Sequence, residues 1–381
     1  MIPYGKHSID DADVESVVDV LRNQFLTQGS VVPRFEQALC DYTGANYAIA
    51  VNSATSGLHI ACLAAGVGQG DLVWTVANSF VASANCARFC GADVDFVDIN
   101  PLTRNIDIAC LEQKLRQAQQ NNRLPKVLIV VHFAGLSCDM QLIRQLTQSY
   151  GIVLIEDAAH ALGGDYLGQK IGSCQFSDMT VLSFHPVKSI TSAEGGAVLT
   201  NKAEYATSVS LFAKHGITRD PALMVSPSDG PWYYQQIELG YNYRLSDVHA
   251  ALGLSQLQKL DQFIGQRRLL AERYRQTIAT LPLLLPSEES YMSSAWHLYM
   301  VELTQHDRLS VYQQLHNKGI GVNVHYIPIH LQPYYQNLGF RKGYLPNTEH
   351  YYQQALTLPL FPSMTEEEQT TVIAALNEVL L

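Results

Sequence analysis

Charge is scarce in this 381-residue chain, because only 16% of its residues are Asp, Glu, Lys or Arg, against roughly 25% in a typical soluble protein. The 25 basic residues are outnumbered by 35 acidic ones, which gives a formal net charge of −10. General nucleic-acid binding needs a basic surface that displaces counterions, so this composition disfavours it. Long apolar runs are also missing, since none approaches the roughly 18–20 residues that cross a bilayer. We therefore expect neither a nucleic-acid partner nor a membrane partner.

Closely spaced cysteine pairs are absent as well, and we expect no secretory leader. The N-terminal residues lack the charged and apolar regions of a signal peptide. No C-x-x-C pair occurs, and an odd, scattered set of thiols fits a reducing cytoplasm better than a disulfide framework. The seven cysteines are Cys40, Cys62, Cys86, Cys90, Cys110, Cys138 and Cys174. We expect a large cytoplasmic enzyme.

Several common catalytic motifs are missing too. Neither G-x-x-x-x-G-K-[ST] nor a G-x-G-x-x-G after the first strand is present, so ATP and dinucleotide sites lack their phosphate loops. The H-E-x-x-H and G-x-S-x-G motifs do not occur. Among thirteen histidines, the closest pair is His325 and His330, and no cysteine or carboxylate lies near it at ligand spacing. We expect no metal site.

What the chain does contain, between residues 47 and 199, is an alternation of short apolar runs with longer amphipathic ones. Helical patterns cover Ile108–Gln120 and Met140–Tyr150. Continuous apolar strands separated by helices indicate an α/β fold with a mostly parallel sheet covered on both faces, and such a sheet binds ligands beyond the carboxyl ends of its strands. The predicted strands are Tyr47–Asn52, Leu72–Thr75, Asp93–Val97, Val127–Val131, Ile152–Glu156, Met179–Ser183 and Gly196–Leu199.

The C-terminal part has a different pattern. Residues Ser246–Leu281 have high helix propensity and predict one or two linking helices. An apolar segment, a helix, a strand-like piece and a last helix follow, and they predict a compact α/β unit. These are Trp296–Leu303, Leu309–Lys318, Val322–Tyr326 and Thr365–Leu380. We expect a large domain over residues 1–255, and a linker helix with a small C-terminal domain over residues 256–381.

Polar residues of interest follow two predicted strands. Asn52–His59 (NSATSGLH) offers hydroxyls and backbone amides to an anion at a helix N-terminus, although it could be an ordinary helix cap. In Ile155–His160 (IEDAAH), two carboxylates end a strand, and one of them must point into the site. Such a carboxylate can hold a proton on a heterocyclic nitrogen. The alternatives are a cap for Asp157 and a satisfied core histidine for His160.

A lysine follows a third strand. Lys188, in SFHPVK, has almost no charged neighbours in sequence, and desolvation would lower its pKa as a Schiff-base amine requires. The alternative is a lysine whose stem covers apolar surface. A fourth segment, Gly240–Asp247, is polar before the long helix and could be a loop and cap. With an aromatic-rich segment around Phe80, these features together predict a pyridoxal 5′-phosphate site.

With these motifs, the sequence resembles the DegT/DnrJ-type nucleotide-sugar aminotransferases of the aspartate-aminotransferase superfamily (pyridoxal-phosphate fold type I). The family signature S-F-H-x-x-K, followed by E-G-G, stands here as Ser183–Lys188 and Glu194–Gly196. The resemblance extends from Leu26–Gly29 through His325–Pro328 to the last helix. It implies a mostly parallel sheet covered by helices, with a smaller C-terminal α/β domain.

The resemblance also implies roles for individual residues. Lys188 would form the Schiff base and carry the proton, Asp157 would pair with the pyridine nitrogen, and His160 would contact the ring hydroxyl. Phe80 would stack on the ring. The phosphate would be held by Ala54, Thr55, Ser183 and the partner subunit's Asn242, which makes a homodimer with shared active sites an expectation.

Four segments (Leu26–Gly29, Val131–Gly135, Thr191–Glu194 and Glu238–Arg244) look like the branch of this family that acts in pseudaminic acid biosynthesis. That branch moves an amino group from L-glutamate to C4 of UDP-2-acetamido-2,6-dideoxy-β-L-arabino-hex-4-ulose, a UDP-linked 4-keto sugar. Residues expected to line the substrate pocket are Tyr4, Leu26, Thr27, Gln28, Gly29, His185, Val324, His325 and Tyr326.

Other functions stay open at this point. Another UDP- or dTDP-linked 4-keto sugar could be the substrate, and a non-catalytic regulator of the same fold could bind the cofactor without turning over. Sugar 3-dehydratases of this family characteristically replace the lysine with histidine, so Lys188 counts against that activity. A nicotinamide-dependent oxidoreductase lacks its glycine fingerprint here.

Overall fold

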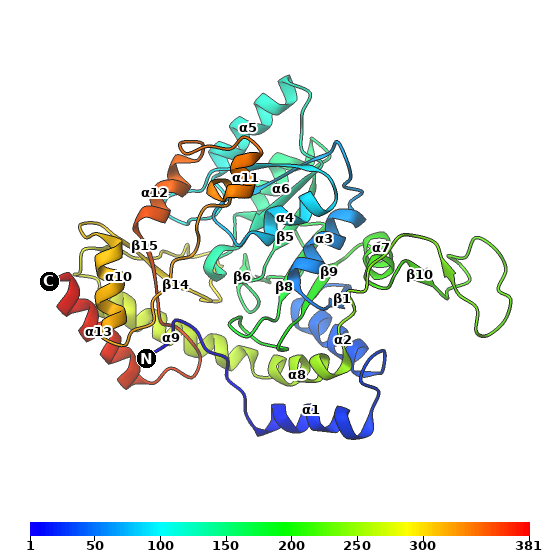
Figure 1. Cartoon of the computed structure of the whole chain (residues 1–381), viewed down its shortest axis with the longest axis horizontal. Coiled ribbons are helices and arrows are strands. Elements are labelled where there is room, and N and C mark those ends of the chain that lie inside the picture. Colours follow the sequence, from blue (N-terminus) through cyan, green and yellow to red (C-terminus); the bar gives the residue numbers. More distant parts are fainter.

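A seven-stranded sheet forms the centre of the molecule in the computed structural model, which describes all residues 1–381 (Figure 1). The strand order is β1-β9-β8-β5-β4-β2-β3, and only β9 runs antiparallel to its neighbours. The strands are β1 (Tyr47–Val51), β2 (Leu72–Val76), β3 (Asp93–Val97), β4 (Val127–Val131), β5 (Val153–Asp157), β8 (Met179–Ser183) and β9 (Gly196–Thr200). Every predicted strand between residues 47 and 199 lies within one residue of these bounds, and the expected mostly parallel α/β sheet is confirmed.

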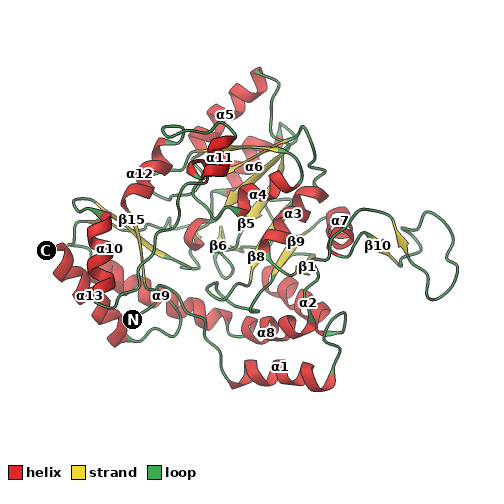
Figure 2. Ribbon diagram, in the orientation of Figure 1, coloured by secondary structure: helices red, strands yellow, loops and turns green.

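Helices cover both faces of this sheet (Figure 2). Alternate residues of one strand face opposite layers, as in Val181 and Leu182, because side chains alternate along a strand. On one face lie α3 (Ala54–Ala64), α4 (Ala82–Phe89) and α7 (Ala203–Ala213). On the other lie α2 (Val31–Thr43), α5 (Ile108–Gln120), α6 (Met140–Gln148) and α8 (Asp247–Leu257).

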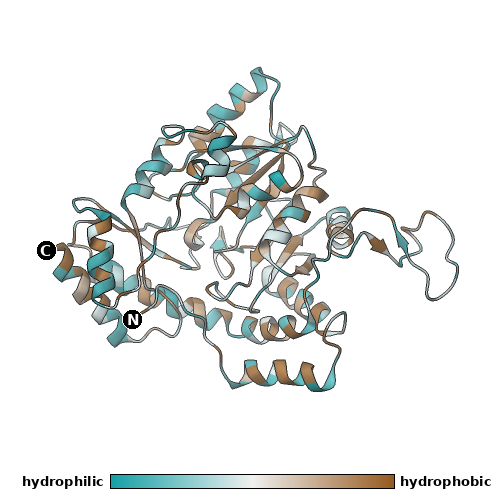
Figure 3. Ribbon diagram, viewed as in Figure 1, coloured by the Kyte–Doolittle hydropathy of each residue, from teal (hydrophilic) through white to brown (hydrophobic).

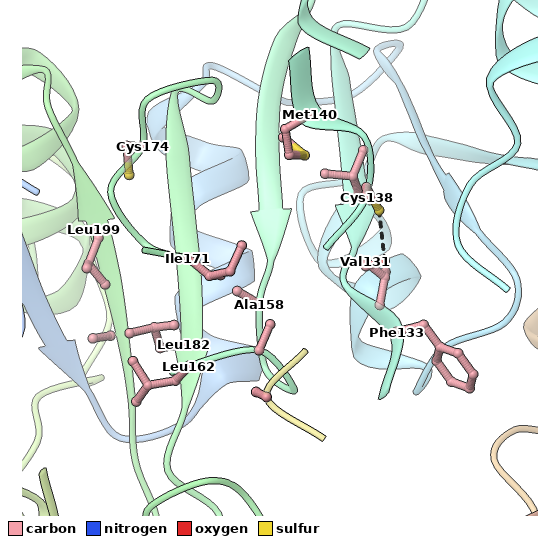
Figure 4. Close-up of a cluster of buried hydrophobic side chains, with 14 of the residues drawn as sticks. Val131, Phe133, Cys138, Met140, Ala158, Leu162, Ile171, Cys174, Leu182 and Leu199 are labelled. Atoms are coloured by element: carbon pink, nitrogen blue, oxygen red, sulfur yellow. Dashed lines mark hydrogen bonds between the residues drawn. The ribbon is translucent and has the colours of Figure 1, made fainter. Parts of the chain in front are cut away.

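The second face carries the largest apolar core. Figure 4 shows part of it, where Leu182 and Leu199 from neighbouring strands lie with Leu162 and Ile171 from the segment between β5 and β8. The Cys138 thiol donates to the Val131 carbonyl over 3.2 Å, which ties the loop after β4 back to its strand (Figure 4). All seven cysteines are free thiols.

Helix α1 (Asp11–Asn23) packs along α8 at the edge of this layer (Figure 1). Its buried Asp13 accepts hydrogen bonds from Ser255 and Gln256 and pairs with Lys259 at 2.6 Å. The helix is therefore attached through a buried carboxylate as well as through apolar packing.

The C-terminal residues form a third core around a three-stranded sheet of β12 (Leu283–Leu284), β14 (Tyr299–Leu303) and β15 (Ala355–Leu358). Around it lie α10 (Arg308–Asn317) and α13 (Glu366–Leu380). Helix α9 (Leu260–Thr277) joins two cores, because Phe263 packs in the first and Tyr274 in the third. The prediction of one or two helices over Ser246–Leu281 is confirmed by α8 and α9, whereas their linking role and the domain division after residue 255 stay predictions.

The strand predicted at Val322–Tyr326 was wrong. Only an isolated bridge joins Asn323 to Thr357 there. The His325 carbonyl accepts instead from the Tyr351 hydroxyl over 2.9 Å, so the chain turns away from the sheet edge. The remaining elements are the short helices η1 (Phe133–Gly135), η2 (Ile329–Leu331), α11 (Pro333–Asn337) and α12 (Pro346–Gln354), and the short strands β6 (Asp165–Tyr166), β7 (Gln169–Lys170) and β13 (Met292–Ser293).

A long hairpin projects from the body of the molecule, at the right of Figure 1. It contains β10 (Ile217–Thr218) and β11 (Gln235–Gln236), and its apolar stretches are visible in Figure 3. Several of its apolar side chains are exposed to solvent, Val225 by 86% and Trp232 by 70%. No helix of the chain combines the length and apolar character needed to span a membrane.

Candidate active site

A cleft of about 340 Å³ opens at the edge of the sheet where β1, β5 and β8 end. The parallel strands all place their carboxyl ends at this edge, as ligand sites in such sheets require. Strand β9 runs the other way, so its first residue, Gly196, meets Val51 and Ser183 at the same edge. A more open hollow of about 830 Å³ lies near the start of β2 and β3, and it contains none of the predicted site residues.

The Asn52–His59 segment forms one wall of the cleft. Ser53 caps α3 by accepting from the Ser56 amide over 3.1 Å, which leaves the first-turn amides of Ala54 and Thr55 at the helix N-terminus. Such amides bind anions, because they have no partner within the helix. A Cβ on Gly196 would lie 2.6 Å from the Ala54 nitrogen, so a glycine is needed for β9 to lie against this turn.

The two adjacent carboxylates at the end of β5 point in opposite directions. Asp157 lines the cleft, whereas the buried Glu156 carboxylate faces the other layer and contacts His132 over 2.6 Å. Asp157 is itself 5% exposed, accepts from the Ser83 hydroxyl over 2.6 Å, and forms no ion pair within 4.0 Å. A buried carboxylate with so few partners is suited to holding a proton of a ligand.

His160 lies beside Asp157 as a neutral imidazole. Its Nδ1 accepts from the Ala134 amide over 3.2 Å, so the remaining proton is on Nε2, which lies 3.1 Å from the Tyr326 hydroxyl. Burial and the charge of Lys188 hold the pKa of His160 well below its usual range. The imidazole is therefore a hydrogen-bonding group here and not a cation.

Lys188 extends from the loop after β8 into the same cleft. Desolvation lowers the pKa of its amine to about 8, and the charge of Asp157 only partly opposes this shift. The Lys188 amine forms no ion pair within 4.0 Å. A lysine with a lowered pKa is suited to nucleophilic attack on a carbonyl.

Most residues that the sequence predicted for the site come together in this cleft. Phe80 lies at its mouth, 59% exposed, with its ring 6.5 Å from that of Tyr326. The predicted residues that line the cleft are Tyr4, Ala54, Thr55, Phe80, Asp157, His160, Ser183, His185, Lys188, His325 and Tyr326.

Other predicted residues lie outside the cleft of a single chain. The segment Leu26–Gly29 is held at the start of α8, where the Gly29 amide donates to Asp247 over 2.8 Å, and Leu26 is 51% exposed. The Asn242 carbonyl accepts from the side-chain Nδ2 of Asn52 of the same chain over 3.4 Å. The residues not among the lining set are Leu26, Thr27, Gln28, Gly29, Val324 and Asn242.

Some lining residues were not predicted. His297 comes from the loop before β14, its ring lies 4.4 Å from that of His160, and its Nδ1 is buried without a hydrogen-bond partner. Nothing in the local sequence marks it, because the loop reaches the site only through tertiary packing. Ser79 follows β2, and the signal that singled out residues 52–59, hydroxyls after a strand, could have found it.

These groups fit pyridoxal phosphate. Helix-terminal amides suit its phosphate, the exposed Phe80 ring suits its aromatic face, and the carboxylate of Asp157 suits its pyridine nitrogen. The amine of Lys188 suits its aldehyde. No cluster of three or more His, Cys, Asp or Glu side chains is arranged to hold a metal ion.

Known proteins resemble this chain along its whole length. The UDP-4-amino-4,6-dideoxy-N-acetyl-β-L-altrosamine transaminase of Campylobacter jejuni is 37% identical, covering 100% of this chain and 98% of the relative. Among solved structures, PseC of Helicobacter pylori, an aminotransferase involved in pseudoaminic acid biosynthesis, superposes with a TM-score of 0.91 at 30% identity, covering 100% and 99% of the two chains. A Streptococcus pneumoniae protein described as a sugar aminotransferase, Spr1654, in its PMP form, gives 0.91 at 29% identity, with the same coverage.

The match to a family is equally extensive, because residues 7–377 fit the DegT/DnrJ/EryC1/StrS aminotransferases. The expected fold, enzyme class and cofactor are thereby confirmed, and they agree with the chemistry of the cleft. The chain belongs to the DegT/DnrJ/EryC1/StrS aminotransferase family, and it is a sugar aminotransferase that uses pyridoxal phosphate.

Proposed function

We propose that this enzyme moves an amino group from L-glutamate to C4 of UDP-2-acetamido-2,6-dideoxy-β-L-arabino-hex-4-ulose, in pseudaminic (nonulosonic) acid biosynthesis in the cytoplasm. The proposed substrate rests on the whole-length similarity to the Campylobacter jejuni transaminase, and it is supported by the likeness to PseC. The chemistry is supported by the Lys188 amine, which shares one buried cleft with Asp157.

Lys188 is the proposed catalytic residue. Its Nζ would hold the cofactor covalently at rest and, once displaced by glutamate, would move a proton from the substrate Cα to C4′ of the cofactor. With the keto sugar bound, the same amine would return a proton in the reverse direction, to C4 of the sugar. The flexible four-carbon stem lets one amine reach both carbons. The bound cofactor supplies an electron sink for the carbanion that proton removal leaves.

The other cleft residues would bind and orient. Asp157 would keep the proton on the pyridine nitrogen. His160 would contact the ring hydroxyl through its imidazole, which is held in place by the hydrogen bond between its Nε2 and the Tyr326 hydroxyl. Phe80 would stack on the ring. The phosphate would be bound by the amides and hydroxyls of Ala54, Thr55 and Ser183.

The sugar nucleotide would occupy the outer part of the cleft. Tyr4 and His325 lie with their rings 5.2 Å apart, next to Tyr326 and His185 at the entrance. We propose that Leu26–Gly29 and Val324 extend this wall in the assembled enzyme. Burial lowers the pKa of both His185 and His325, so these imidazoles are neutral at pH 7, which suits recognition of a sugar through hydrogen bonds and stacking.

A homodimer completes the proposed site, with the phosphate also bound by the partner subunit's Asn242. The exposed apolar side chains of the projecting hairpin support such an interface, because large exposed apolar residues mark protein–protein contact surfaces. Leu239, 74% exposed, continues that surface toward Asn242 in sequence.

The test combines spectroscopy with product analysis. Glutamate added to the holoenzyme should convert the absorbance of lysine-bound cofactor to that of pyridoxamine phosphate. A panel of UDP- and dTDP-linked 4-keto sugars should then give the 4-amino product fastest with the proposed UDP sugar, as identified by mass spectrometry and NMR. Lys188→Ala should remove the lysine-bound absorbance and lower turnover by about 10³-fold or more, and Asp157→Asn should lower turnover by about 10²-fold or more while keeping the cofactor.

Lys342→Ala, which removes an exposed lysine, is the matched control and should behave like the wild type. A faster reaction with another keto sugar would reassign the substrate within the same activity. No spectral change with glutamate would favour a dehydratase or a non-catalytic regulator. A Lys188→Ala enzyme that kept both absorbance and turnover would refute the catalytic assignment.

A further inference from the structure

The carboxylate of Asp157 is held from one side by the turn that follows β2. Its Oδ2 accepts from the Ser83 hydroxyl over 2.6 Å, and its Oδ1 accepts from the Ala159 amide over 3.2 Å. The shorter contact is in the range typical of a hydroxyl that donates to an ionised carboxylate. The two oxygens are thus fixed by two separate elements, and the carboxylate plane is not free to turn.

Ser83 is in turn oriented by a second hydroxyl. The oxygens of Ser79 and Ser83 lie 2.7 Å apart, and both residues are buried, with Ser83 0% exposed. A serine hydroxyl has one hydrogen, so when Ser83 donates to Asp157 it must accept from Ser79. The direction of the chain is therefore Ser79 to Ser83 to Asp157, and such chains strengthen each hydrogen bond through mutual polarisation.

The same turn also carries Phe80. The Ser83 amide donates to the Phe80 carbonyl over 3.3 Å, so one short stretch at the start of α4 positions both the exposed aromatic ring and the hydroxyl on Asp157. Phe80 lines the cleft just before α4, and Ser83 lies buried behind Asp157 in the first turn of α4, whereas Asp157 and Lys188 reach the cleft from β5 and the loop after β8. The turn can therefore set the position of the Asp157 carboxylate relative to a cofactor ring that stacks on Phe80.

We propose that Ser83, oriented by Ser79, is a positioning residue that directs the Asp157 carboxylate at the pyridine nitrogen of the cofactor. The proposal rests on the proposed role of Asp157. Ser83 acts through that carboxylate and needs no contact of its own with the cofactor or the substrate. Its removal would leave Oδ2 without its donor in a buried site, so that the carboxylate can turn away from the ring.

The test uses the full-length holoenzyme and follows the glutamate half-reaction in a stopped-flow spectrometer. Ser83→Ala should slow the half-reaction roughly tenfold to hundredfold, the range expected for a hydrogen bond to a charged group. Ser83→Thr keeps the hydroxyl and should stay within about threefold of the wild type, whereas a packing role alone would not be rescued by threonine in preference to alanine. Ser79→Ala should have a smaller effect in the same direction.

Two further measurements separate this proposal from the function on which it rests. In an enzyme reconstituted with a carbocyclic cofactor analogue that has CH in place of the ring nitrogen, Ser83→Ala should change the rate less than about twofold, since no pyridine proton remains to be held. In an Asp157→Asn background, Ser83→Ala should add no further loss. If Asp157→Asn itself were harmless, the proposed function would fail. If Asp157→Asn were inactive while Ser83→Ala was as fast as wild type, or equally impaired with both cofactors, only the role of Ser83 would be overturned.

Discussion

An amine that attacks a carbonyl must first lose its proton, and at the residue scale Lys188 is placed to do so. Its amine lies among three buried imidazoles, those of His160, His297 and His325, whose pKa values are lowered first by burial and then by the charge of Lys188. Burial in this surrounding also disfavours the ammonium, whereas the charge of Asp157 favours it. The result is a pKa of about 8, against about 10.4 for an ordinary lysine.

This pKa predicts how the apoenzyme captures pyridoxal phosphate as pH changes. Because the pKa is lowered, the reactive free amine increases as pH rises and is nearly complete about one unit above pH 8. The capture rate should therefore rise about tenfold between pH 7 and pH 9 and then level off, as measured by stopped-flow absorbance. Free Nα-acetyl-lysine, measured in parallel, corrects for titration of the cofactor. Its rate of reaction with pyridoxal phosphate should keep rising about tenfold per pH unit through pH 9. A protein profile that still rose at that rate above pH 9 would contradict the lowered pKa.

Single residues differed in how well the sequence could place them. Lys188, Asp157 and the Ala54–Thr55 turn follow predicted strands, and parallel strands bring their ends to one edge, so their meeting could be predicted. The positions of Ser83 and His297 could not be predicted, because strand order does not determine that Ser83 contacts Asp157 or that His297 lies beside His160. Glu156 and Asp157 point in opposite directions because side chains alternate along a strand. Which of the two faces the cleft depends on the register of β5, since a shift by one residue would exchange them.

At the scale of elements, buried strands were the best predicted. Strands such as β4 are fully buried apolar runs, so their bounds follow from composition. The direction of β9 was not predictable from its own residues, yet it brings Gly196 against the first turn of α3, at Ala54. Val322–Tyr326 has the apolar pattern of a strand, but its pairing with β15 is limited to Asn323 and Thr357. The His325 carbonyl accepts from the Tyr351 hydroxyl instead, which a local pattern does not reveal.

Helix α1 shows the same limit, because its attachment depends on a charge. Asp13 is buried between α1 and α8, where it bonds to Ser255, Gln256 and Lys259. Asp13→Ala would leave these donors without their acceptor, so we expect a loss of about 2–4 kcal/mol in the free energy of unfolding. Urea unfolding followed by circular dichroism measures the loss.

Asp11→Ala is the control for this prediction, because Asp11 lies in the same first turn of α1 and is exposed. Its effect should stay below about 1 kcal/mol, which covers the interaction of an exposed carboxylate with the helix dipole. Equal losses for the two variants would show that Asp13 acts only through the helix terminus and not through α8.

At the scale of the whole molecule, the net charge of −10 contrasts with the proposed ligands, since the cofactor phosphate, glutamate and a UDP sugar are all anionic. Local binding would resolve this contrast. Helix-terminal amides and Lys188 would bind these anions inside a cleft where the distant surface charges are screened. The scarcity of charge has a second consequence, because exposed apolar residues such as Trp232 on the hairpin and Leu239 just after it would be available for a partner subunit.

If the partner subunit's Asn242 completes the phosphate site, two differently damaged chains should repair one another. Lys188→Ala and Asn242→Ala homodimers should both have low activity, whereas a mixed dimer would contain one site with both residues intact and one with neither. Random exchange gives about half mixed dimers, so co-refolding equal amounts should restore about a quarter of the wild-type rate. The activity is measured before and after exchange, with light scattering to confirm the dimer, and Lys188→Ala mixed with wild type serves as the control for exchange. If the two residues acted within the same chain, mixing would restore nothing, because the Lys188→Ala subunit would be inactive and the Asn242→Ala subunit would stay impaired.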